Sequence, residues 1–466
     1  MNRRSAWLLL CLMPLAAPAA ESVNVSVPEH QQVRLSNGLQ LILIPRRDLP
    51  LIAFNAVLRG GARLDPTNKS GVAMLTADLL SYGAGDRDAF AFADAVEGVG
   101  GHLDADVRNE SLVVRGQFLS RDSTLMLSLL ADVLQRPHLD AAELQKLQAR
   151  HIEAIRASKD SQPQALIGNY GRALLFGSHP YARPVGGSES SLARITRDDV
   201  LRYYRDYFGA DRLILAIAGD FDATEMRRAV ERSFGRWKMA AQPLPPLAEP
   251  LRPTGRRVLL VDAPGASQTY FWLGNVGINR SYTARAALDI ANTAFGGSFS
   301  SMLNTELRTR TGLTYGASSR FSRGEVAGEV MLSSFTRTAD TGRALELAFA
   351  TLQKLRNEHL DDEVINATRR YMLGQYPLTY ETSGEWAAAL ADLALYQLPV
   401  SHIGEYGSAL LKADRRSVTR VIDSDFPKPA NLYIVLIGDA ARIRDVARSL
   451  GPVVEKPLAA PDFNPR

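Results

Sequence analysis

The chain has 466 residues, of which 46% are hydrophobic and 22% charged, and its formal net charge is +4. This length exceeds what a single hydrophobic core usually supports, so we expect more than one domain. The ordinary composition excludes a low-complexity chain, and the weak net charge argues against proteins that bind nucleic acid or charged membrane surfaces.

The N-terminal residues are typical of a signal peptide. Arg3 and Arg4 precede an apolar run at residues 7–15, and Ala17-Pro18-Ala19 offers a small-residue cleavage site. We predict a signal peptide at residues 1–19 and an exported protein, periplasmic if the source is a Gram-negative bacterium. The run is shorter than the ~20 residues of a membrane span, so we expect none after cleavage. Cleavage would also remove Cys11, the single cysteine, and with it any thiol chemistry.

Strand signals open the first half of the chain and helix signals follow. Asn37-Gly38 separates two alternating runs, which predicts a β-hairpin, and residues 51–63 continue the sheet. The apolar spacing then predicts helices at 71–82, 89–96, 125–134 and 141–159, and a closing strand at 213–218. Strands, then helices, then a final strand are typical of an α+β fold.

A proline-rich linker divides the chain into two similar halves. Residues 239–257 contain five prolines and no helical or strand period. Each half ends in an apolar strand, a Gly-Asp turn and an amphipathic helix, with Gly219 and Gly438 in equivalent positions. Gly83 and Gly296 are a second pair at a similar offset. We therefore predict two homologous α/β-sandwich domains, at 31–238 and 258–460, each an antiparallel-rich sheet with helices on one face.

Several motifs occur in the order found in one family of peptidases. They are "LSNGLQLILIPR", "GGARLDP", "GVAMLTADLL", "SHPYARPVGG" and "LRTRTGLTYGASS". Together they resemble the insulinase/pitrilysin family of metallopeptidases, which includes the mitochondrial processing peptidase and paired bacterial exported proteins. The resemblance runs from about Val33 to the C-terminus, and it implies two domains arranged like a clam around an unfolded peptide.

The metal motif of that family is degenerate here. Active members carry His-x-x-Glu-His on a helix, where two histidines bind zinc and the glutamate takes a proton from zinc-bound water. The resemblance implies that Met74 and Asp78 occupy the histidine positions and Ala77 the glutamate position. A more distant glutamate completes the site in relatives. Its position is Ala154 here, or Glu153 if the alignment shifts by one residue.

The loss of a zinc site can be checked without the family. The chain has seven histidines, and the two nearest in sequence, His138 and His151, are 13 residues apart. No helix can therefore present two of them at the i, i+4 spacing. A site built from scattered residues, such as Asp78, His151 and Glu153, stays open as an alternative. We therefore expect that this chain binds no metal. We expect no other cofactor, because no phosphate loop or dinucleotide fingerprint occurs. A serine-nucleophile elbow is also absent.

The second half keeps two residues that the family uses on the substrate. The resemblance implies that Arg308 and Tyr315 contact the peptide, the tyrosine by donating to the oxyanion. It also implies that Gly296, Gly297 and Ser298 form a substrate-binding loop, although the glycines could simply end a helix. We expect Arg308 at a helix end and Tyr315 at the start of the next strand. Arg310 could be the relevant cation instead.

These observations predict a non-catalytic subunit of a heterodimeric zinc metallopeptidase. The expected partner is a paralogous chain with an intact motif, which holds zinc, and the expected substrate is an unfolded peptide or protein segment. Alone, the chain should have no peptidase activity. The alternative is a structural scaffold or peptide-binding chaperone of the same fold, in which Arg308 and Tyr315 have no catalytic role.

Overall fold

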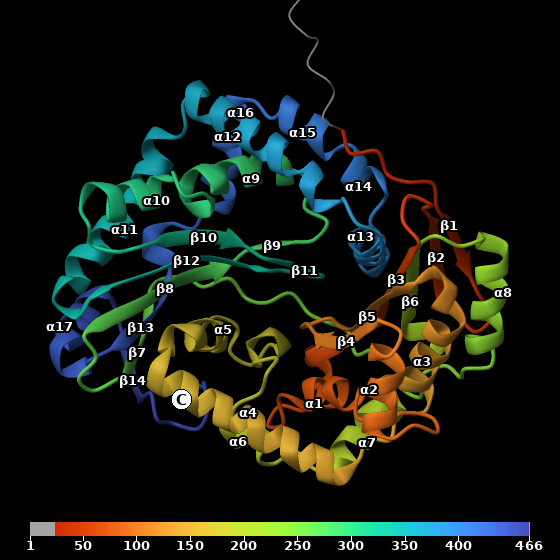
Figure 1. Ribbon diagram of the computed structural model, residues 1–466. Coiled ribbons are helices and arrows are strands. Elements are labelled where there is room, and N and C mark those ends of the chain that lie inside the picture. The colour runs from red at the N-terminus through yellow and green to blue at the C-terminus, as the bar shows by residue number, and fades with distance from the viewer. Residues whose placement is uncertain (1–23, 466) are drawn as a thin grey trace, which may run out of the picture.

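The structure is a computed structural model that describes residues 24–465. These residues form two six-stranded β-sheets packed against helices, and one short two-stranded sheet (Figure 1). This architecture confirms the predicted α+β class with two sheet-and-helix units. The predicted signal peptide at 1–19 lies outside the described residues.

The first sheet has the strand order β1-β2-β6-β3-β5-β4. Its strands are β1 (Gln31–Arg34), β2 (Gln40–Pro45), β3 (Leu51–Arg59), β4 (His102–Val107), β5 (Ser111–Leu119) and β6 (Leu213–Gly219). The predicted hairpin is confirmed, because β1 and β2 pair antiparallel with Arg34 opposite Gln40. Its turn needs glycine at Gly38, whose φ is +92°, in the left-handed region that other residues rarely adopt.

The helices of the first half are α1 (Val72–Leu79), α2 (Ala89–Glu97), α3 (Ser123–Gln135), α4 (Ala141–Ser161), α5 (Ile167–Phe176), α6 (Glu189–Leu192), α7 (Arg197–Tyr207) and α8 (Ala223–Phe234). Helices α1–α4 and α8 confirm predicted helices, whereas α5, α6 and α7 were not predicted. Helix α1 is shorter than predicted at both ends. The pair β4–β5 was not predicted, because β4 is only partly buried and its polar residues give a weak strand signal.

The second sheet repeats the first, with the order β10-β12-β8-β13-β7-β14. Its strands are β7 (Arg257–Asp262), β8 (Gln268–Val276), β10 (Ala317–Phe321), β12 (Glu329–Arg337), β13 (Tyr433–Gly438) and β14 (Val453–Pro457), and β9 (Ile278–Asn279) pairs with β11 (Arg323–Gly324) outside it. The parallel pair β2–β6 corresponds to β7–β13, and the antiparallel strands β3, β5 and β4 correspond to β8, β12 and β10. The two halves thus share one topology, as the sequence repeat predicted. They differ only in the outer strand beside the parallel pair, which is antiparallel in β1 and parallel in β14.

The second half holds the remaining helices. They are α9 (Arg285–Asn292), α10 (Met302–Asn304), α11 (Thr341–Glu358), α12 (Asp362–Gln375), α13 (Ser383–Leu395), α14 (Ser401–Gly404), α15 (Tyr406–Lys412), α16 (Arg415–Asp425) and α17 (Ala440–Leu450), with two π-helical turns, η6 (Thr293–Gly297) and η7 (Thr305–Arg310). None of the helices in residues 24–465 has the length and apolarity that a membrane crossing requires.

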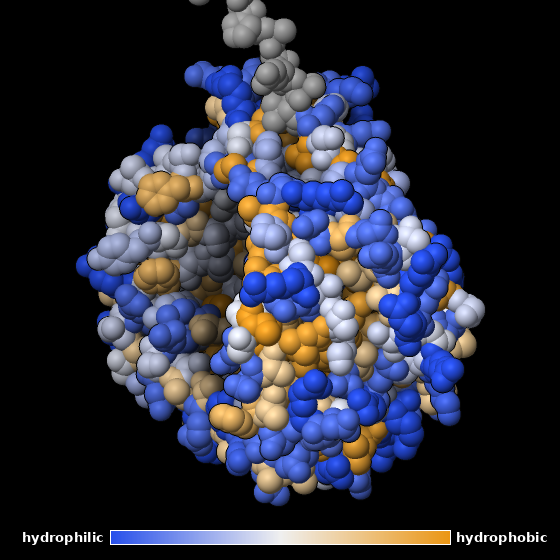
Figure 2. Space-filling view, turned by 45° about the vertical axis from the view of Figure 1, so that its right-hand side comes forward, coloured by the Kyte–Doolittle hydropathy of each residue, from blue (hydrophilic) through white to orange (hydrophobic). Residues whose placement is uncertain are grey.

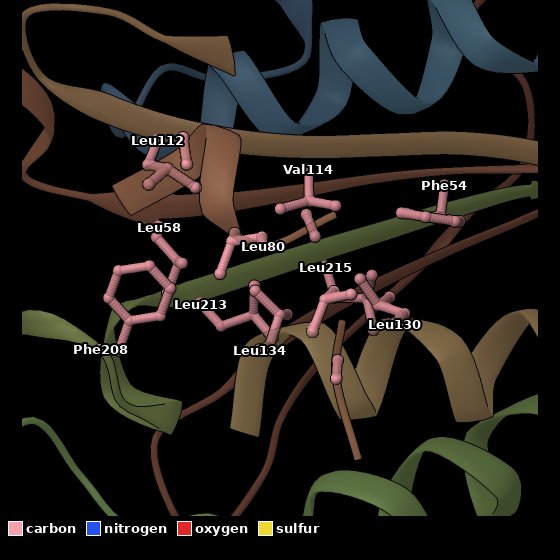
Figure 3. Packing of buried hydrophobic residues seen from close by; sticks show 14 of the residues in the cluster. Phe54, Leu58, Leu80, Leu112, Val114, Leu130, Leu134, Phe208, Leu213 and Leu215 are labelled. Atoms are coloured by element: carbon pink, nitrogen blue, oxygen red, sulfur yellow. The ribbon is translucent and has the colours of Figure 1, made fainter. Parts of the chain in front are cut away.

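Both faces of each sheet are buried, and each half covers one face of the other. Along β2, Leu41 and Leu43 enter the core beneath α1 and α3, whereas Ile42 and Ile44 point to the opposite face. Figure 3 shows the first of these cores, where strand residues such as Phe54 and Val114 pack against Leu130 of α3. The opposite face is covered by α13 from the second half, and α5 from the first half covers β8 and β13. This exchange was not predicted, since the sequence suggested helices on one face only.

The segment predicted as a linker has no helix or strand until β7 begins at Arg257. Hydrogen bonds hold it to both halves: the Ala240 N–H donates to Asp211 Oδ1 at 2.7 Å, and Arg252 Nη1 donates to the Val276 carbonyl at 3.0 Å. Leu244 packs on the core of the first half, and Leu247 packs on the cluster around α5. The segment is therefore anchored along its path.

Candidate functional site

Helix α1 is held by a buried carboxylate at its start. Asp65, which is 1% exposed, accepts hydrogen bonds from the Gly71 and Ala73 N–H groups at 2.7 and 2.8 Å. These are among the N–H groups that a helix leaves without partners in its first turn. Burial, the largest influence, raises the pKa of Asp65 to about 7, although the two N–H donors and Arg183 act in the opposite direction.

The positions that we predict to be a degenerate metal site lie on one side of α1. Ala77 is 1% exposed, and Met74 is half-buried and packs on the core. The Asp78 carboxylate is the one charged group among the three. It accepts a hydrogen bond at Oδ2 from His151 Nε2 on α4, at 2.6 Å. His151, which is far in sequence from every other histidine, therefore lies against α1 and is hydrogen-bonded there to Asp78.

On helix α4, the helical spacing places Ala154, and not Glu153, on the same face as His151. His151 and Ala154 are three residues apart and share one helix face, whereas Glu153 is two residues from His151 and faces elsewhere. Glu153 is exposed and forms an ion pair with Arg156 at 2.6 Å. This geometry favours Ala154 as the position of the distal ligand, and the assignment remains a prediction.

The donors at α1 and α4 do not fit zinc. A protein zinc site uses three or four nitrogen, sulfur or carboxylate ligands around one point. Here Asp78 and His151 are the two possible donors, and they are bonded to each other. Throughout residues 24–465, no three His, Cys, Asp or Glu side chains are grouped closely enough to hold a metal ion. The alternative site of Asp78, His151 and Glu153 is not assembled, because Glu153 points to Arg156.

In the second half, close packing requires glycine at position 296. It is buried in η6, and a Cβ there would lie 2.4 Å from Ser319 Oγ and 2.7 Å from the Ser319 backbone nitrogen on β10. Only glycine allows this close approach. Gly297 is exposed, and the Ser298 carbonyl accepts a hydrogen bond from Asn304 Nδ2 at 3.2 Å. Gly297 and Ser298 thus start a loop that leads to the exposed ring of Phe299.

Arg308 lies in η7 with its guanidinium over Phe299. The guanidinium carbon is 4.2 Å from the ring centroid, and the ring itself is 75% exposed. Arg308 forms no ion pair with a carboxylate in residues 24–465, whereas Arg310 pairs with Glu306 at 2.8 Å. Of the two candidate cations, Arg308 is therefore the one whose charge is not neutralised.

Tyr315 is exposed in the bend that follows η7. Its side chain is 83% exposed, its hydroxyl has no hydrogen-bond partner in the described residues, and its ring lies 6.4 Å, centre to centre, from Phe335 on β12. Tyr315 lies in the bend two residues before β10, so the expectation that it begins the strand was wrong. Gly312, with φ of +62°, makes the turn between η7 and this bend.

The two sites are far apart within one chain. Figure 1 places α1 beneath the first sheet and α10, which directly precedes η7, on the far side of the second sheet. Sequence reasoning missed Asp65, Phe299 and Phe335. Phe299 could have been found, since it is an aromatic residue within the polar, glycine-rich stretch "GGSFSS". Phe335 could not, because its contact depends on strand pairing.

Comparisons with known proteins agree with this fold. A model described as "Insulinase (Peptidase family M16)" matches residues 54–188, and one described as "Peptidase M16 inactive domain" matches residues 194–372. An uncharacterized zinc protease of Mycobacterium tuberculosis is 30% identical over 307 residues, which is 65% of this chain and 68% of that protein. One of Mycobacterium leprae is 28% identical over 333 residues, 71% of this chain and 74% of that protein.

Solved structures match at lower identity and show the fold alone. A peptidase M16 inactive domain from Pseudomonas fluorescens superposes with a TM-score of 0.82 at 22% identity, over 88% of this chain and 98% of that one. The periplasmic protease PqqL of Escherichia coli superposes with a TM-score of 0.75 at 16% identity, over 93% of this chain and 48% of that one. By its family models and its sequence relatives, the chain belongs to the insulinase family, peptidase family M16.

Proposed function

We propose that this chain is the non-catalytic subunit of an exported heterodimeric zinc metallopeptidase. A paralogous partner with an intact His-x-x-Glu-His motif holds the zinc, and this chain completes the substrate chamber. The observation that carries the proposal is that, within residues 24–465, the exposed Tyr315 hydroxyl has no hydrogen-bond partner and the half-buried Arg308 has no ion pair, while α1 and α4 lack a set of metal donors.

The first half supports a role without metal. Ala77 cannot act as a general base, and Asp78 is engaged with His151. The helix that would carry the motif is nevertheless capped by Asp65 and packed on the core. The fold has thus kept its architecture where its catalytic groups are replaced, as a subunit that shapes a chamber requires.

Arg308 and Tyr315 suit the binding of a peptide under attack. When water attacks an amide, negative charge develops on the carbonyl oxygen, and a tyrosine hydroxyl can donate to that oxygen. A guanidinium can hold a neighbouring peptide carbonyl through its planar fork of donors. The partner's zinc would activate the attacking water. Gly297 and Ser298 would lie alongside the peptide, with Gly296 as the packing support of that loop.

The organisation of the chain follows from the same proposal. We assign the peptidase-like domains to residues 31–238 and 258–460, the linker to 239–257 and a signal peptide to 1–19. The site of action would be the periplasm if the source is a Gram-negative bacterium. The substrate would be an unfolded peptide or protein segment.

The test is peptidase activity of the purified chain, of the zinc-motif partner and of the two together. We expect activity from the pair only, abolished by a chelator. In the pair, Tyr315→Phe should lower kcat roughly 100-fold, which is the usual effect of losing one oxyanion donor, while assembly is unchanged. Arg308→Gln should lower kcat/KM at least about tenfold.

Matched controls separate chemistry from folding. Tyr371→Phe removes a hydroxyl from a tyrosine that is also exposed, on α12, and Arg310→Gln removes the arginine that is paired with Glu306. Both variants should keep activity within about twofold. Chelator-sensitive activity of this chain alone would contradict the proposal. An active pair that is unaffected by Tyr315→Phe and Arg308→Gln would instead favour the scaffold alternative.

A further inference from the structure

A cavity of ≈ 700 Å³ lies where the two halves meet. It is bounded by the turn between β4 and β5, by α5, by the strands β10–β12 and by α13, and Figure 2 shows the surface deeply hollowed left of centre. Five arginines line the cavity against three acidic residues. The arginines are Arg108, Arg172, Arg280, Arg320 and Arg323, and the acidic residues are Glu110, Glu329 and Asp392.

Some of these charged side chains already form ion pairs or hydrogen bonds within the protein. Arg280 pairs with Asp392 at 2.5 Å, and Arg323 pairs with Asp289 outside the cavity lining. Glu110 accepts hydrogen bonds from the Tyr181 hydroxyl, from the Tyr396 hydroxyl at 2.6 Å and from the Glu325 N–H at 2.7 Å. Glu110 therefore joins the two halves and has little capacity left for a ligand.

Three other groups remain available. Arg108 and Arg320 have no side-chain hydrogen bond or ion pair in residues 24–465, and both are exposed. Glu329 is 7% exposed, and its Oε2 has no hydrogen-bond partner in the same range, although Arg172 Nη1 lies 3.7 Å from its Oε1. A buried carboxylate oxygen without a donor is costly, so the cavity lacks an N–H or O–H donor at this point.

One strip of the second sheet runs from the cavity, which Arg320 and Glu329 line, to Phe335 beside Tyr315. Along β10 and β12, Ser318 and Ser333 face each other with their hydroxyl oxygens 3.1 Å apart, and Arg320 stands opposite Met331. Side chains two residues apart point to the same face, so Glu329, Met331, Ser333 and Phe335 share it. Phe335 contacts Tyr315. The arginine cavity and Tyr315 thus lie at two ends of one strip, separated by about six residues of strand or about 20 Å.

We propose that this cavity binds the acidic end of a peptide. A peptide carboxylate pairs with Arg108 and Arg320, and a peptide N–H donates to Oε2 of Glu329. An extended peptide held in this way reaches Tyr315 about six residues further along the chain. This position relative to Tyr315 rests on the proposed function, whereas binding of an acidic peptide by the isolated chain does not.

The test measures binding to the isolated, full-length mature protein. The probe is a fluorescein-labelled ten-residue peptide of Gly, Ser and Ala with two glutamates at its C-terminus, followed by fluorescence anisotropy. We expect saturable binding that weakens as salt rises. The same peptide with two glutamines and a C-terminal amide should bind at least about tenfold more weakly. Arg320→Gln and Arg108→Gln should each weaken binding of the acidic peptide about tenfold and leave the neutral peptide unchanged.

A matched control uses an arginine away from the cavity. Arg227 on α8 pairs with Glu231 on the surface, and Arg227→Gln removes the same charge without touching the cavity. The Arg227→Gln variant should bind the acidic peptide as tightly as the wild type does. Equal binding of the acidic and neutral peptides, or equal losses in all three arginine variants, would overturn the proposal. So would saturable binding of inorganic phosphate without binding of the acidic peptide.

A second measurement in the assembled pair tests the spacing. Substrates with one glutamate placed three, six or nine residues from the cleaved bond should show the lowest KM at six. Arg320→Gln should remove this preference and leave kcat unchanged. A pair without activity would contradict the proposed function but not the binding of acidic peptides by the isolated chain. An active pair whose KM does not depend on the position of the glutamate would contradict the proposed spacing between the cavity and Tyr315.

Discussion

At the scale of single residues, helix α1, which we predict to be a former metal helix, is held in place by a buried carboxylate at its start. Asp65 is buried and bonds two N–H groups at the start of α1, while the positions that would bear the motif hold Met74, Ala77 and Asp78. The helix is therefore stable without a metal ion, because its cap and its apolar face supply the stabilising contacts.

The buried carboxyl of Asp65 predicts a pH dependence of stability. Its pKa rises from the ordinary 3.8 to about 7 in the folded state, so the folded protein binds the proton more tightly than the unfolded chain. The associated stability is fully present below about pH 4 and is lost as the pH rises through 7, by at most about 1.4 kcal/mol per pH unit. Urea unfolding from pH 4.5 to 7.5 should show this fall in wild type.

Asp65→Asn isolates that contribution, since an amide does not titrate. The variant should be less stable by roughly 1–2 kcal/mol at the acidic end, because one N–H donor loses its acceptor. Its deficit should shrink toward pH 7. A deficit that stays constant or grows with pH would mean that Asp65 is already ionised in the folded protein at low pH.

Variants that restore metal ligands on α1 can decide whether Ala154 or Glu153 occupies the distal ligand position. Met74→His with Asp78→His rebuilds two histidines at the i, i+4 spacing on α1. If Ala154 holds the ligand position, adding Ala154→Glu should strengthen zinc binding about tenfold or more, measured by competition with a chromophoric chelator. If Glu153 holds it, the double variant should already bind as tightly as the triple variant. The wild type should contain no stoichiometric zinc by metal analysis.

At the scale of elements, α5 and α13 each cover the sheet of the other half. Both faces of the central strands are apolar, so each sheet needs cover on both sides. Trp386 of α13 is 4% exposed and stacks on Tyr380 with ring centres 5.0 Å apart. It packs on the face of the first sheet that contains Ile42 and Ile44.

Trp386→Ala should therefore destabilise the whole protein, although it lies in the second half. We expect a loss of about 3–5 kcal/mol in the free energy of unfolding, from lost burial and the cavity left behind. Phe90→Ala on α2 is the control, since Phe90 is 82% exposed and should matter little. Guanidinium unfolding of both variants measures the difference, and equal midpoints would show that α13 does not hold the first sheet.

At the scale of the whole molecule, the exchange of helices makes the halves interdependent. A chain of residues 24–256 would leave the α13 side of its sheet bare, and residues 257–465 would lack α5. We expect each half alone to be insoluble or without a cooperative thermal transition, and co-expression of the two to restore a soluble complex. A sharp transition in either isolated half would contradict this interdependence.

The sequence by itself determined the local elements and the absence of two histidines at helical spacing. Asn37-Gly38 set the hairpin, apolar spacing set the helices, and the positions of the histidines excluded a helical zinc pair. These features depend on residues a few positions apart, which a single sequence displays directly. The repeat of Gly219 and Gly438 likewise indicated the second copy of the sheet.

Only the tertiary structure decided which distant segments meet. It brought His151 to Asp78, α13 to β3 and β6, and the arginines of both halves to one cavity. Apolar residues on both sides of a strand show that each face must be covered, but burial is not directional and does not specify which helix covers it. That choice comes from contacts between residues hundreds of positions apart, and no local pattern of the sequence records it.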